Sequence, residues 1–543
     1  MDLLSFRSKK STWKKALIWG MVLCFSLGVF AFPQQAQAAG YTLKYMTIPG
    51  GPTSETDSTP LKVSAHIYYP KSPMPEGGYP AILFIHSWAL QQNEYDAKMA
   101  EFASKGYITI CYTCRGWYGA PGNTGIASPP EIQDINKVID WLIANTPVNP
   151  DKIGATGISY GGGQSLLALK FEPRIKTVVA MSGWTNLVES LVPNRTFKAS
   201  WASFLAITGY IMANPDDTIK DFCIGSLNYV NQNLNPAAQV RSIATYIDEI
   251  NAREEVPPVF IIQGINEDLF TTRQMVDFYS NYAGPKKITL ANGVHATAEA
   301  SGLFTIPNAN WTDALKWFNY WLKGEQNGIM SQKPFSVYQK WTNTQALFDS
   351  YPLTNQSITL YPTGDGILSS TQAATEGSIT LKNNPKNINT NSGLFYISPM
   401  IQSHAGISIT GADPSKLGVG ATAFETVKLT QDITAAGVPS FHFLVKPDKN
   451  IFQLDFFIYD VDQTGTAKLL YTVPYTNPQA TAGAVNMVDV DLNNVLYYRF
   501  VAGHKIRVVV ATSNSVYVMP VTDAFSVDLL TGSGTSMMMP VIP

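Results

Sequence analysis

The ten residues from Gly154 to Gly163, "GATGISYGGG", place one serine among five glycines. Ser159 stands in the pattern G-x-S-x-G, after the strand-like run "KIGATGIS" and before the helix-like run "GGGQSLLALKF". A nucleophilic serine on a sharp strand-to-helix turn needs small neighbours, because the strand and the helix cross closely there. A flexible glycine-rich loop is the alternative. The flanking patterns favour the turn, so the stretch predicts a nucleophile that is open to substrate.

Short apolar runs alternate with helical patterns on both sides of this turn. The strand-like runs are residues 63–69, 81–86, 107–112, 152–159, 177–183, 259–264 and 287–292. The helix-like runs are residues 131–146, 161–171, 272–283 and 311–324. This alternation predicts a mostly parallel sheet with helices on both faces, which we place at residues 40–333. Residues 186–253 lack strand patterns, so we expect them to form a helical cap inserted over the sheet.

The pattern changes after Lys323. Residues 324–334, "GEQNGIMSQKP", read as a polar linker. Beyond it, short alternating runs are separated by turn signals, for example "SITLYP", "LDFFIYDVD" and "HKIRVVVATS". Helical periodicity is absent from this part. Residues 334–543 are therefore expected to form a second domain, an all-β sandwich or jelly roll.

The N-terminus has the features of a secretory signal peptide. Five Lys or Arg residues precede the uncharged apolar run "ALIWGMVLCFSLGVFAF", and "AQAA" offers a cleavage site after Ala38. We assign residues 1–38 to the signal and expect a secreted protein without stable membrane insertion after cleavage. An uncleaved membrane anchor is the alternative, since the run is just long enough to span a bilayer.

Composition excludes some classes of function. The chain of 543 residues is 45% hydrophobic and 14% charged, a balance common in secreted proteins. Removing residues 1–38 removes five Lys or Arg and one Asp, so the formal charge changes from −2 to −6. A mildly acidic chain gives no reason to expect nucleic-acid binding. Cys111 and Cys114 lie on one extended run, too far apart for a disulfide, and no metal site or cofactor is expected.

A serine nucleophile needs a base and an acid that orients it. In the expected order Ser, acid, His, only His295 follows Ser159 within the α/β part, in a loop after a strand. The acid should follow the strand "VFIIQG", where Glu267 and Asp268 compete. The spacing of three residues after the glycine favours Glu267, whereas Asp is the commoner acid. We favour Glu267 and keep Asp268 as the alternative.

The oxyanion of an acyl-transfer intermediate needs backbone N–H donors. We expect one from Tyr160, directly after the serine, and one from Trp88, in the loop after the strand at residues 81–86. The cap aromatics Trp201, Phe204 and Tyr210 are expected either to wall a substrate pocket or to form the core of the cap. Arg115, in "TCRGWYGAPGN", is expected to hold its loop rather than to bind a substrate anion.

Several stretches resemble the X-prolyl dipeptidyl-peptidase and cocaine-esterase family of serine hydrolases. They are "RGWYGAPGN", "GISYGGG", "WFNYWLKGEQNGI", "FETVKLTQDITAAGVPSFHFLVKPD", "FFIYDVD" and "RFVAGHKIRVVV". The resemblance runs from about Tyr41 to the end. It implies an α/β-hydrolase domain with a helical cap, and a C-terminal jelly roll that helps to wall the active site. It also implies a triad of Ser159, His295 and Glu267 or Asp268.

Two stretches depart from the family pattern. Cocaine esterases carry a tyrosine in the oxyanion loop, but this chain has "HSWALQQ", and their acid motif resembles "GWYD", whereas this chain has "GINED". The resemblance implies hydrolysis of X-Pro peptides, simple esters, or amino-acid esters and β-lactam amides. The expected substrate is a short peptide or a small ester. The alternative from another class is a secreted glycan-binding protein without catalysis.

Overall fold

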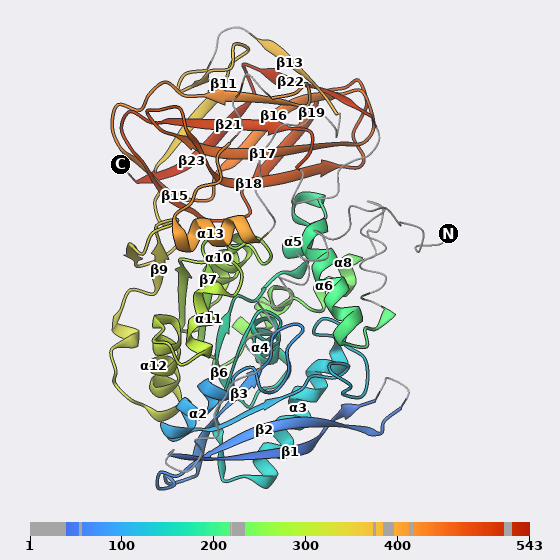
Figure 1. Cartoon of the computed structure of the whole chain (residues 1–543), viewed down its shortest axis with the longest axis vertical. Helices are drawn as coiled ribbons and strands as arrows, with labels where there is room; N and C mark the ends of the chain where they lie inside the picture. The colour runs from blue at the N-terminus through green and yellow to red at the C-terminus, as the bar shows by residue number, and fades with distance from the viewer. Residues whose placement is uncertain are drawn as a thin grey trace, which may run out of the picture.

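The computed structural model describes residues 40–53, 57–217, 219, 234–372, 376–383, 396–411, 414, 417–514 and 524–542. The expected signal peptide and Cys223 lie outside these residues. The part described contains two stacked regions (Figure 1), an α/β region and an all-β region. Among the described helices, none is both long and apolar enough to cross a membrane.

The α/β region is built on one ten-stranded sheet with the order β1-β2-β4-β3-β5-β6-β7-β8-β9-β10. Neighbouring strands from β4 to β9 in this order are parallel, while β1, β2 and β10 pair antiparallel. The strands are β1 (Tyr41–Pro52), β2 (Pro60–Pro70), β3 (Tyr79–Ile85), β4 (Ile108–Tyr112), β5 (Val148–Ile158), β6 (Ile175–Met181), β7 (Val259–Gly264), β8 (Lys286–Ala291), β9 (Phe335–Tyr338) and β10 (Gln345–Phe348).

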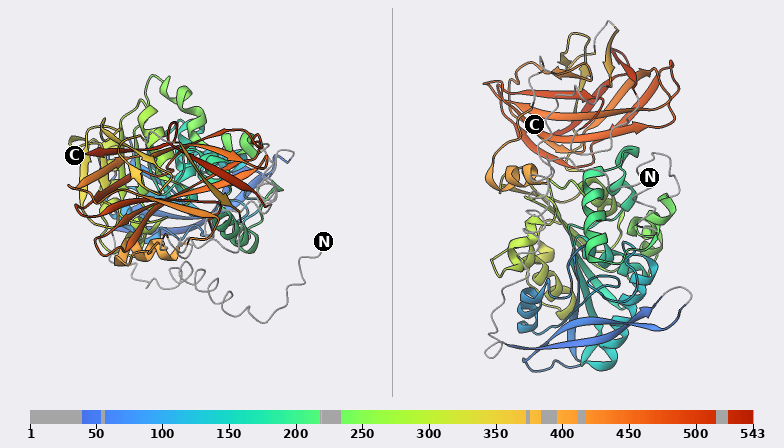
Figure 2. Two further views of the ribbon diagram at one scale, coloured as in Figure 1. Left: turned by 90° about the horizontal axis from the view of Figure 1, so that it is seen from above. Right: turned by 45° about the vertical axis from the view of Figure 1, so that its right-hand side comes forward.

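Helices cover both faces of this sheet, as the alternating pattern predicts (Figure 2). One face packs against α3 (Pro129–Asn145), α4 (Tyr160–Phe171) and α10 (Thr272–Asn281). The other face packs against α2 (Asp96–Ser104) and α12 (Ala309–Lys323), whose Trp317 and Phe318 are fully buried. The short helix α11 (Thr297–Leu303) follows β8. Two apolar cores therefore sandwich the sheet, and its strands can be apolar on both sides.

Two features of this sheet differ from the sequence expectation. The antiparallel strand β1, which we did not predict, pairs with β2 along the edge of the sheet. The strands β9 and β10 continue the sheet as far as Phe348, past the boundary expected between residues 333 and 334. Each of these two strands has four residues. Such short runs carry no periodic signal that could assign them to one sheet or the other.

Every named element described between β6 and β7 is a helix, in agreement with the expected cap. Its elements are α5 (Leu187–Leu191), η2 (Pro193–Arg195), α6 (Ala199–Met212), α8 (Leu234–Gln239), η3 (Ile243–Tyr246) and α9 (Ile247–Asn251). The helix α6 carries Trp201, Phe204 and Tyr210, the three aromatic residues considered for a substrate pocket. Figure 1 shows it beside the sheet, below the all-β region.

The all-β region consists of two antiparallel sheets that enclose an apolar core. Its strands are β11 (Ser357–Pro362), β12 (Leu368–Ser369), β13 (Gly377–Lys382), β14 (Ala421–Glu425), β15 (Ile433–Gly437), β16 (Ser440–Pro447), β17 (Phe452–Val461), β18 (Ala467–Asn477), β19 (Asn486–Asp491), β20 (Leu496–Phe500), β21 (Lys505–Ala511), β22 (Ser526–Thr531) and β23 (Ser536–Ile542). Phe441 of β16 stacks on Phe456 of β17 across the core. The predicted β sandwich is therefore confirmed.

One helix interrupts the all-β region, where we expected none. This helix, α13 (Ile397–Ala405), lies between the β sandwich and the α/β region, close to α10 and β7 (Figure 1). Gln402 of α13 donates a hydrogen bond to the carbonyl of Leu469 on β18, at 3.2 Å. The helix is thus fixed to the sandwich on one side and reaches the α/β region on the other.

Candidate active site

Ser159 occupies the sharp turn that the glycine pattern predicts. It lies between the last residue of β5 and the first residue of α4, with a backbone φ of 57°. A Cβ atom at Gly157 would lie 2.5 Å from the carbonyl oxygen of Ile85, and one at Gly161 would lie 1.8 Å from the same oxygen. Contacts this short are prohibitive. The two glycines therefore let β3 and α4 approach the serine turn.

Three side chains form a continuous hydrogen-bonded chain at this turn. The Ser159 Oγ lies 2.8 Å from Nε2 of His295, and Nδ1 of His295 lies 2.9 Å from Oε2 of Glu267. All three residues are buried, with Ser159 the most exposed at 7%. If Nδ1 donates its proton to Glu267, Nε2 is free to accept the proton of the Ser159 hydroxyl. Glu267 follows Ser159 by 108 positions and precedes His295 by 28 positions, so residues distant in the chain meet in one site.

The structure places Glu267, not Asp268, against the histidine. The other carboxylate oxygen of Glu267 accepts backbone N–H groups from Asp268, Leu269 and Phe270, at 3.1, 2.9 and 3.3 Å. The Asp268 side chain has other neighbours, the buried Lys198 and Trp201. Burial, together with the charge of Glu267, raises the pKa of Asp268 to about 7. Glu267 is consequently the carboxylate that is oriented on the imidazole.

Aromatic rings enclose the imidazole of His295. The rings of Trp201 and Phe270 each pack edge-on against it, with centroids 5.3 Å away. Burial by itself would lower the pKa of His295, but the charge and hydrogen bond of Glu267, aided by Asp268 and Glu299, outweigh burial and raise it. Phe204 packs against Trp201. Of the three cap aromatics considered, Tyr210 is 51% exposed.

The loop after β3 lies directly beside the serine turn. Ser87 donates through its hydroxyl to the carbonyl of Ile158 at 3.1 Å, and through its amide to Glu94 at 2.6 Å. The Trp88 indole donates to Thr208 of α6 at 3.1 Å, and its ring packs edge-on against Tyr160. Among the described residues, no acceptor takes the backbone N–H of Trp88 or Tyr160. Tyr160 and Trp88 remain the predicted oxyanion donors.

Buried carboxylates hold the elements next to the site. The phenol of Tyr160 donates to Glu131, which also accepts the amide of Ser128 at 2.6 Å. Arg115 binds Asp134 through two nitrogens, each at 2.7 Å, and both side chains are buried. These contacts agree with the structural role expected for Arg115. The cysteines Cys111 and Cys114 are buried free thiols, as expected.

One hydrogen-bonded pair at the histidine loop was not predicted from the sequence. Ser182, which follows β6, donates to Glu299 at 2.8 Å and accepts the amide of Ala296 at 3.2 Å. Burial raises the pKa of Glu299 to about 7. Ser182 has a positive φ of 44°, directly after a buried strand. Its position at the end of a strand could have predicted a place near the site, because polar side chains at such strand ends gather near the ligand site of open α/β sheets.

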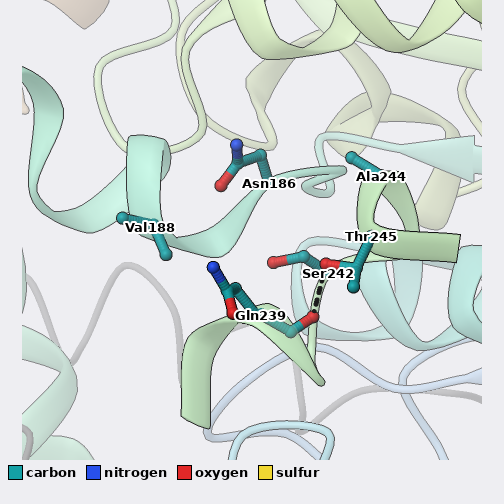
Figure 3. Close-up of a pocket in the computed structure, with 6 residues that line it drawn as sticks. All are labelled: Asn186, Val188, Gln239, Ser242, Ala244 and Thr245. Carbon is teal, nitrogen blue, oxygen red and sulfur yellow. Dashed lines mark hydrogen bonds between the residues drawn. The ribbon is translucent and has the colours of Figure 1, made fainter. Parts of the chain in front are cut away.

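A separate pocket of about 300 Å³ lies within the cap. Its lining residues are Asn186, Val188, Gln239, Ser242, Ala244 and Thr245 (Figure 3). Within this lining, the amide of Ser242 donates to the carbonyl of Gln239 at 2.9 Å. None of the lining residues belongs to the site at Ser159.

The fold and this site define a protein of the α/β-hydrolase class with a serine, a histidine and a glutamate in hydrogen-bond contact. Residues 57–297 match the family model described as X-Pro dipeptidyl-peptidase (S15 family), and residues 327–527 match the X-Pro dipeptidyl-peptidase C-terminal non-catalytic domain. The chain therefore belongs to the X-Pro dipeptidyl-peptidase (S15) family, whose members are serine hydrolases. The resemblance drawn from the sequence motifs is confirmed.

Individual relatives are distant. A putative Xaa-Pro dipeptidyl-peptidase of Bacillus anthracis is 22% identical over 272 residues, which is 44% of this chain and 42% of that protein. The chain spans about half the length of the curated relatives it matches.

Solved structures match over nearly the whole chain. An aminopeptidase from the marine sediment archaeon Thaumarchaeota archaeon has 15% identity and a TM-score of 0.70, covering 95% of this chain and 98% of its own. An α-amino acid ester hydrolase has 16% identity and a TM-score of 0.70, covering 94% and 98%. At this level of identity, these two structures establish the fold alone.

Proposed function

We propose that the chain is a secreted serine hydrolase that cleaves a short peptide or small ester through an acyl-enzyme. One observation supports this most strongly: the unbroken hydrogen-bonded chain from Ser159 Oγ through His295 to Glu267. Secretion rests on the expected signal peptide at residues 1–38. Membership of the X-Pro dipeptidyl-peptidase family supports cleavage after an X-Pro dipeptide.

The proposed reaction has two halves. Ser159 Oγ attacks the substrate carbonyl carbon while His295 Nε2 takes the hydroxyl proton, and the backbone amides of Tyr160 and Trp88 bind the oxyanion. The imidazolium then protonates the leaving amine or alcohol as its bond to the carbonyl breaks. Water, deprotonated by His295, attacks the acyl-enzyme and releases the acid and Ser159. Glu267 keeps the imidazole oriented and stabilises its positive charge.

A simple ester is the second candidate substrate, and one observation favours it. A dipeptidyl-peptidase needs acidic groups that bind the free amine of its substrate. The carboxylates described beside the triad already have partners, since Asp268 lies next to Lys198 and Glu299 binds Ser182. Lys198 is itself buried and donates to the carbonyl of Leu269 at 2.7 Å. A cationic substrate would have to compete with this lysine, whereas an uncharged ester would not.

Side-by-side turnover decides between the two substrates. The wild-type chain is assayed on an X-Pro anilide and on a short acyl ester, with Ser159→Ala as the blank for each. Turnover of the anilide that disappears in Ser159→Ala supports the dipeptidyl-peptidase. Turnover of the ester alone supports the esterase, and turnover of either substrate that survives in Ser159→Ala contradicts the proposed nucleophile.

A further inference from the structure

The loop that carries Glu267 is held in place by residues of the C-terminal half. This acid loop, residues 265–270, joins β7 to α10. The phenol of Tyr471 on β18 donates to the carbonyl of Ile265. The side-chain amino group of Lys340 donates to the side-chain oxygen of Asn266, and the nitrogen of the same amide donates to Ser403 Oγ at 2.8 Å. Three separate segments of the C-terminal half thus bind the first two residues of the loop.

The histidine loop has similar contacts. The phenol of Tyr396 donates to the carbonyl of His295 at 3.1 Å, and its ring packs edge-on against Trp201, which in turn packs on the imidazole. The side chain of Asn292 donates to the carbonyl of Ser403 at 3.1 Å. Ser403, on α13, therefore contacts both loops. Figure 1 shows α13 between the sandwich and the α/β region, a position from which it can reach both loops.

The three side chains that bind the acid loop are buried, and two of them contact each other. Tyr471, Lys340 and Ser403 are 8%, 3% and 4% exposed. The nitrogen of Lys340 lies 3.6 Å from the centre of the Tyr471 ring. Burial lowers the pKa of Lys340 well below its ordinary value, which limits the charge it brings to the acid loop. Buried side chains with satisfied hydrogen bonds have little freedom, so they can fix a backbone to within a fraction of an ångström.

We propose that Tyr471, Lys340 and Ser403 are positioning residues for Glu267, so that the domain described as non-catalytic sets the geometry of the active site. This inference rests on the proposed function. The amide of Glu267 donates to the carbonyl of Gly264 at 3.2 Å, so the loop turns tightly directly after β7. A shift at Ile265 or Asn266 would be transmitted through this turn to the carboxylate on His295. Small misplacements of catalytic groups are costly, and 1 Å can reduce the rate about 100-fold.

The test removes single contacts from the acid loop. Tyr471→Phe loses the hydroxyl on Ile265 but keeps the ring beneath Lys340. Tyr498→Phe is the matched control, because its hydroxyl is also buried and bonds to Asp460 at 2.8 Å, within the sandwich. The turnover rate on the better substrate is divided by the concentration of reactive serine, titrated with a fluorophosphonate. This normalisation excludes misfolded protein from the comparison. We expect kcat per titrated serine to fall about tenfold in Tyr471→Phe, with KM within twofold of wild type and Tyr498→Phe unchanged.

The second variant, Ser403→Ala, removes only the hydroxyl on Asn266 and keeps the test decisive if Tyr471→Phe does not fold. A kcat loss with unchanged KM in Ser403→Ala supports the proposal. Wild-type kcat per titrated serine in the folded variants, or an equal loss in Tyr498→Phe, overturns it while leaving the triad intact. Failure of Ser159 to react with the fluorophosphonate in the wild-type chain would overturn the proposed function and this inference together.

Discussion

The turn that carries Ser159 and the loop that carries Glu267 are built in opposite ways. Residues close in sequence form the serine turn, where Gly157 and Gly161 clear the space and β5 and α4 fix the direction. Residues from distant segments hold the acid loop: Tyr471 contacts it from β18 of the all-β region, and Lys340 contacts it from the connection between β9 and β10.

This difference separates two kinds of information. A turn encoded by its own residues can be recognised in a short stretch of sequence. For a loop held by distant residues, the local sequence shows only which acidic residues are candidates. The geometry of such a loop depends on the whole fold. Both kinds of structure converge on His295.

The largest expected effect comes from His295, the residue at which the serine turn and the acid loop meet. In His295→Ala, Ser159 loses its base, so kcat should fall by about 10⁵-fold on the better substrate. His442→Ala serves as the control, because His442 is a partly exposed histidine of β16 that pairs with Asp489. Steady-state kinetics measure the effect. A loss below about 100-fold in His295→Ala would contradict its role as the base.

The next effect tests which acid the loop presents. Glu267→Gln keeps the shape of the side chain but cannot fix the imidazole tautomer, so kcat should fall about 10³-fold to 10⁴-fold. Asp268→Asn should lower kcat less than tenfold, because Asp268 faces Lys198 rather than His295. The same kinetic assay compares the two variants. The reverse order of losses would assign the acid to Asp268.

A third prediction tests the locally built turn. In Gly161→Ala, the new Cβ would lie 1.8 Å from the backbone oxygen of Ile85 and could be accommodated only if β3 and α4 separate. We expect a loss of about 3–5 kcal/mol in the free energy of unfolding, measured by chemical denaturation. Gly364→Ala is the control, since its nearest neighbour would lie at an ordinary 3.6 Å. Equal stability of the two variants would refute the close crossing.

The smallest expected effect is a shift in pH dependence. His295 must be neutral to accept the serine proton, so kcat/KM should fall as the pH drops through its pKa. Because Glu267 raises this pKa above the ordinary value, the acidic limb should lie at higher pH in the wild type than in Glu267→Gln. The pH profiles of kcat/KM for the wild type and Glu267→Gln measure this shift of the acidic limb. A limb that stays in place in Glu267→Gln would show that Glu267 does not act on the imidazole.

The sequence predicted the parts of the molecule that are local. The alternation of strand-like and helix-like runs identified β2 to β8 and the helices α3, α4, α10 and α12, and the glycine pattern located Ser159. His295 followed from chain order, because few histidines were available. Glu267 could only be favoured over Asp268, since adjacent residues share the same local signal.

The remaining features depend on contacts between distant residues. The four-residue strands β9 and β10 join the first sheet through the parallel pairing of β9 with β8. The helix α13 lies in an otherwise β-structured region. Tyr471 and Ile265 are separated by more than 200 positions, and no period or motif links them. Sequence patterns report local geometry, so they could not reveal which domain holds the acid loop.

The most direct measurement is the site of covalent labelling by a fluorophosphonate, read by mass spectrometry of the digested chain. The wild-type protein should carry one phosphonyl group, on the peptide that contains Ser159, and His295→Ala should remain unlabelled over the same time. A label on another residue, or equal labelling of wild type and His295→Ala, would contradict the activation of Ser159 by His295.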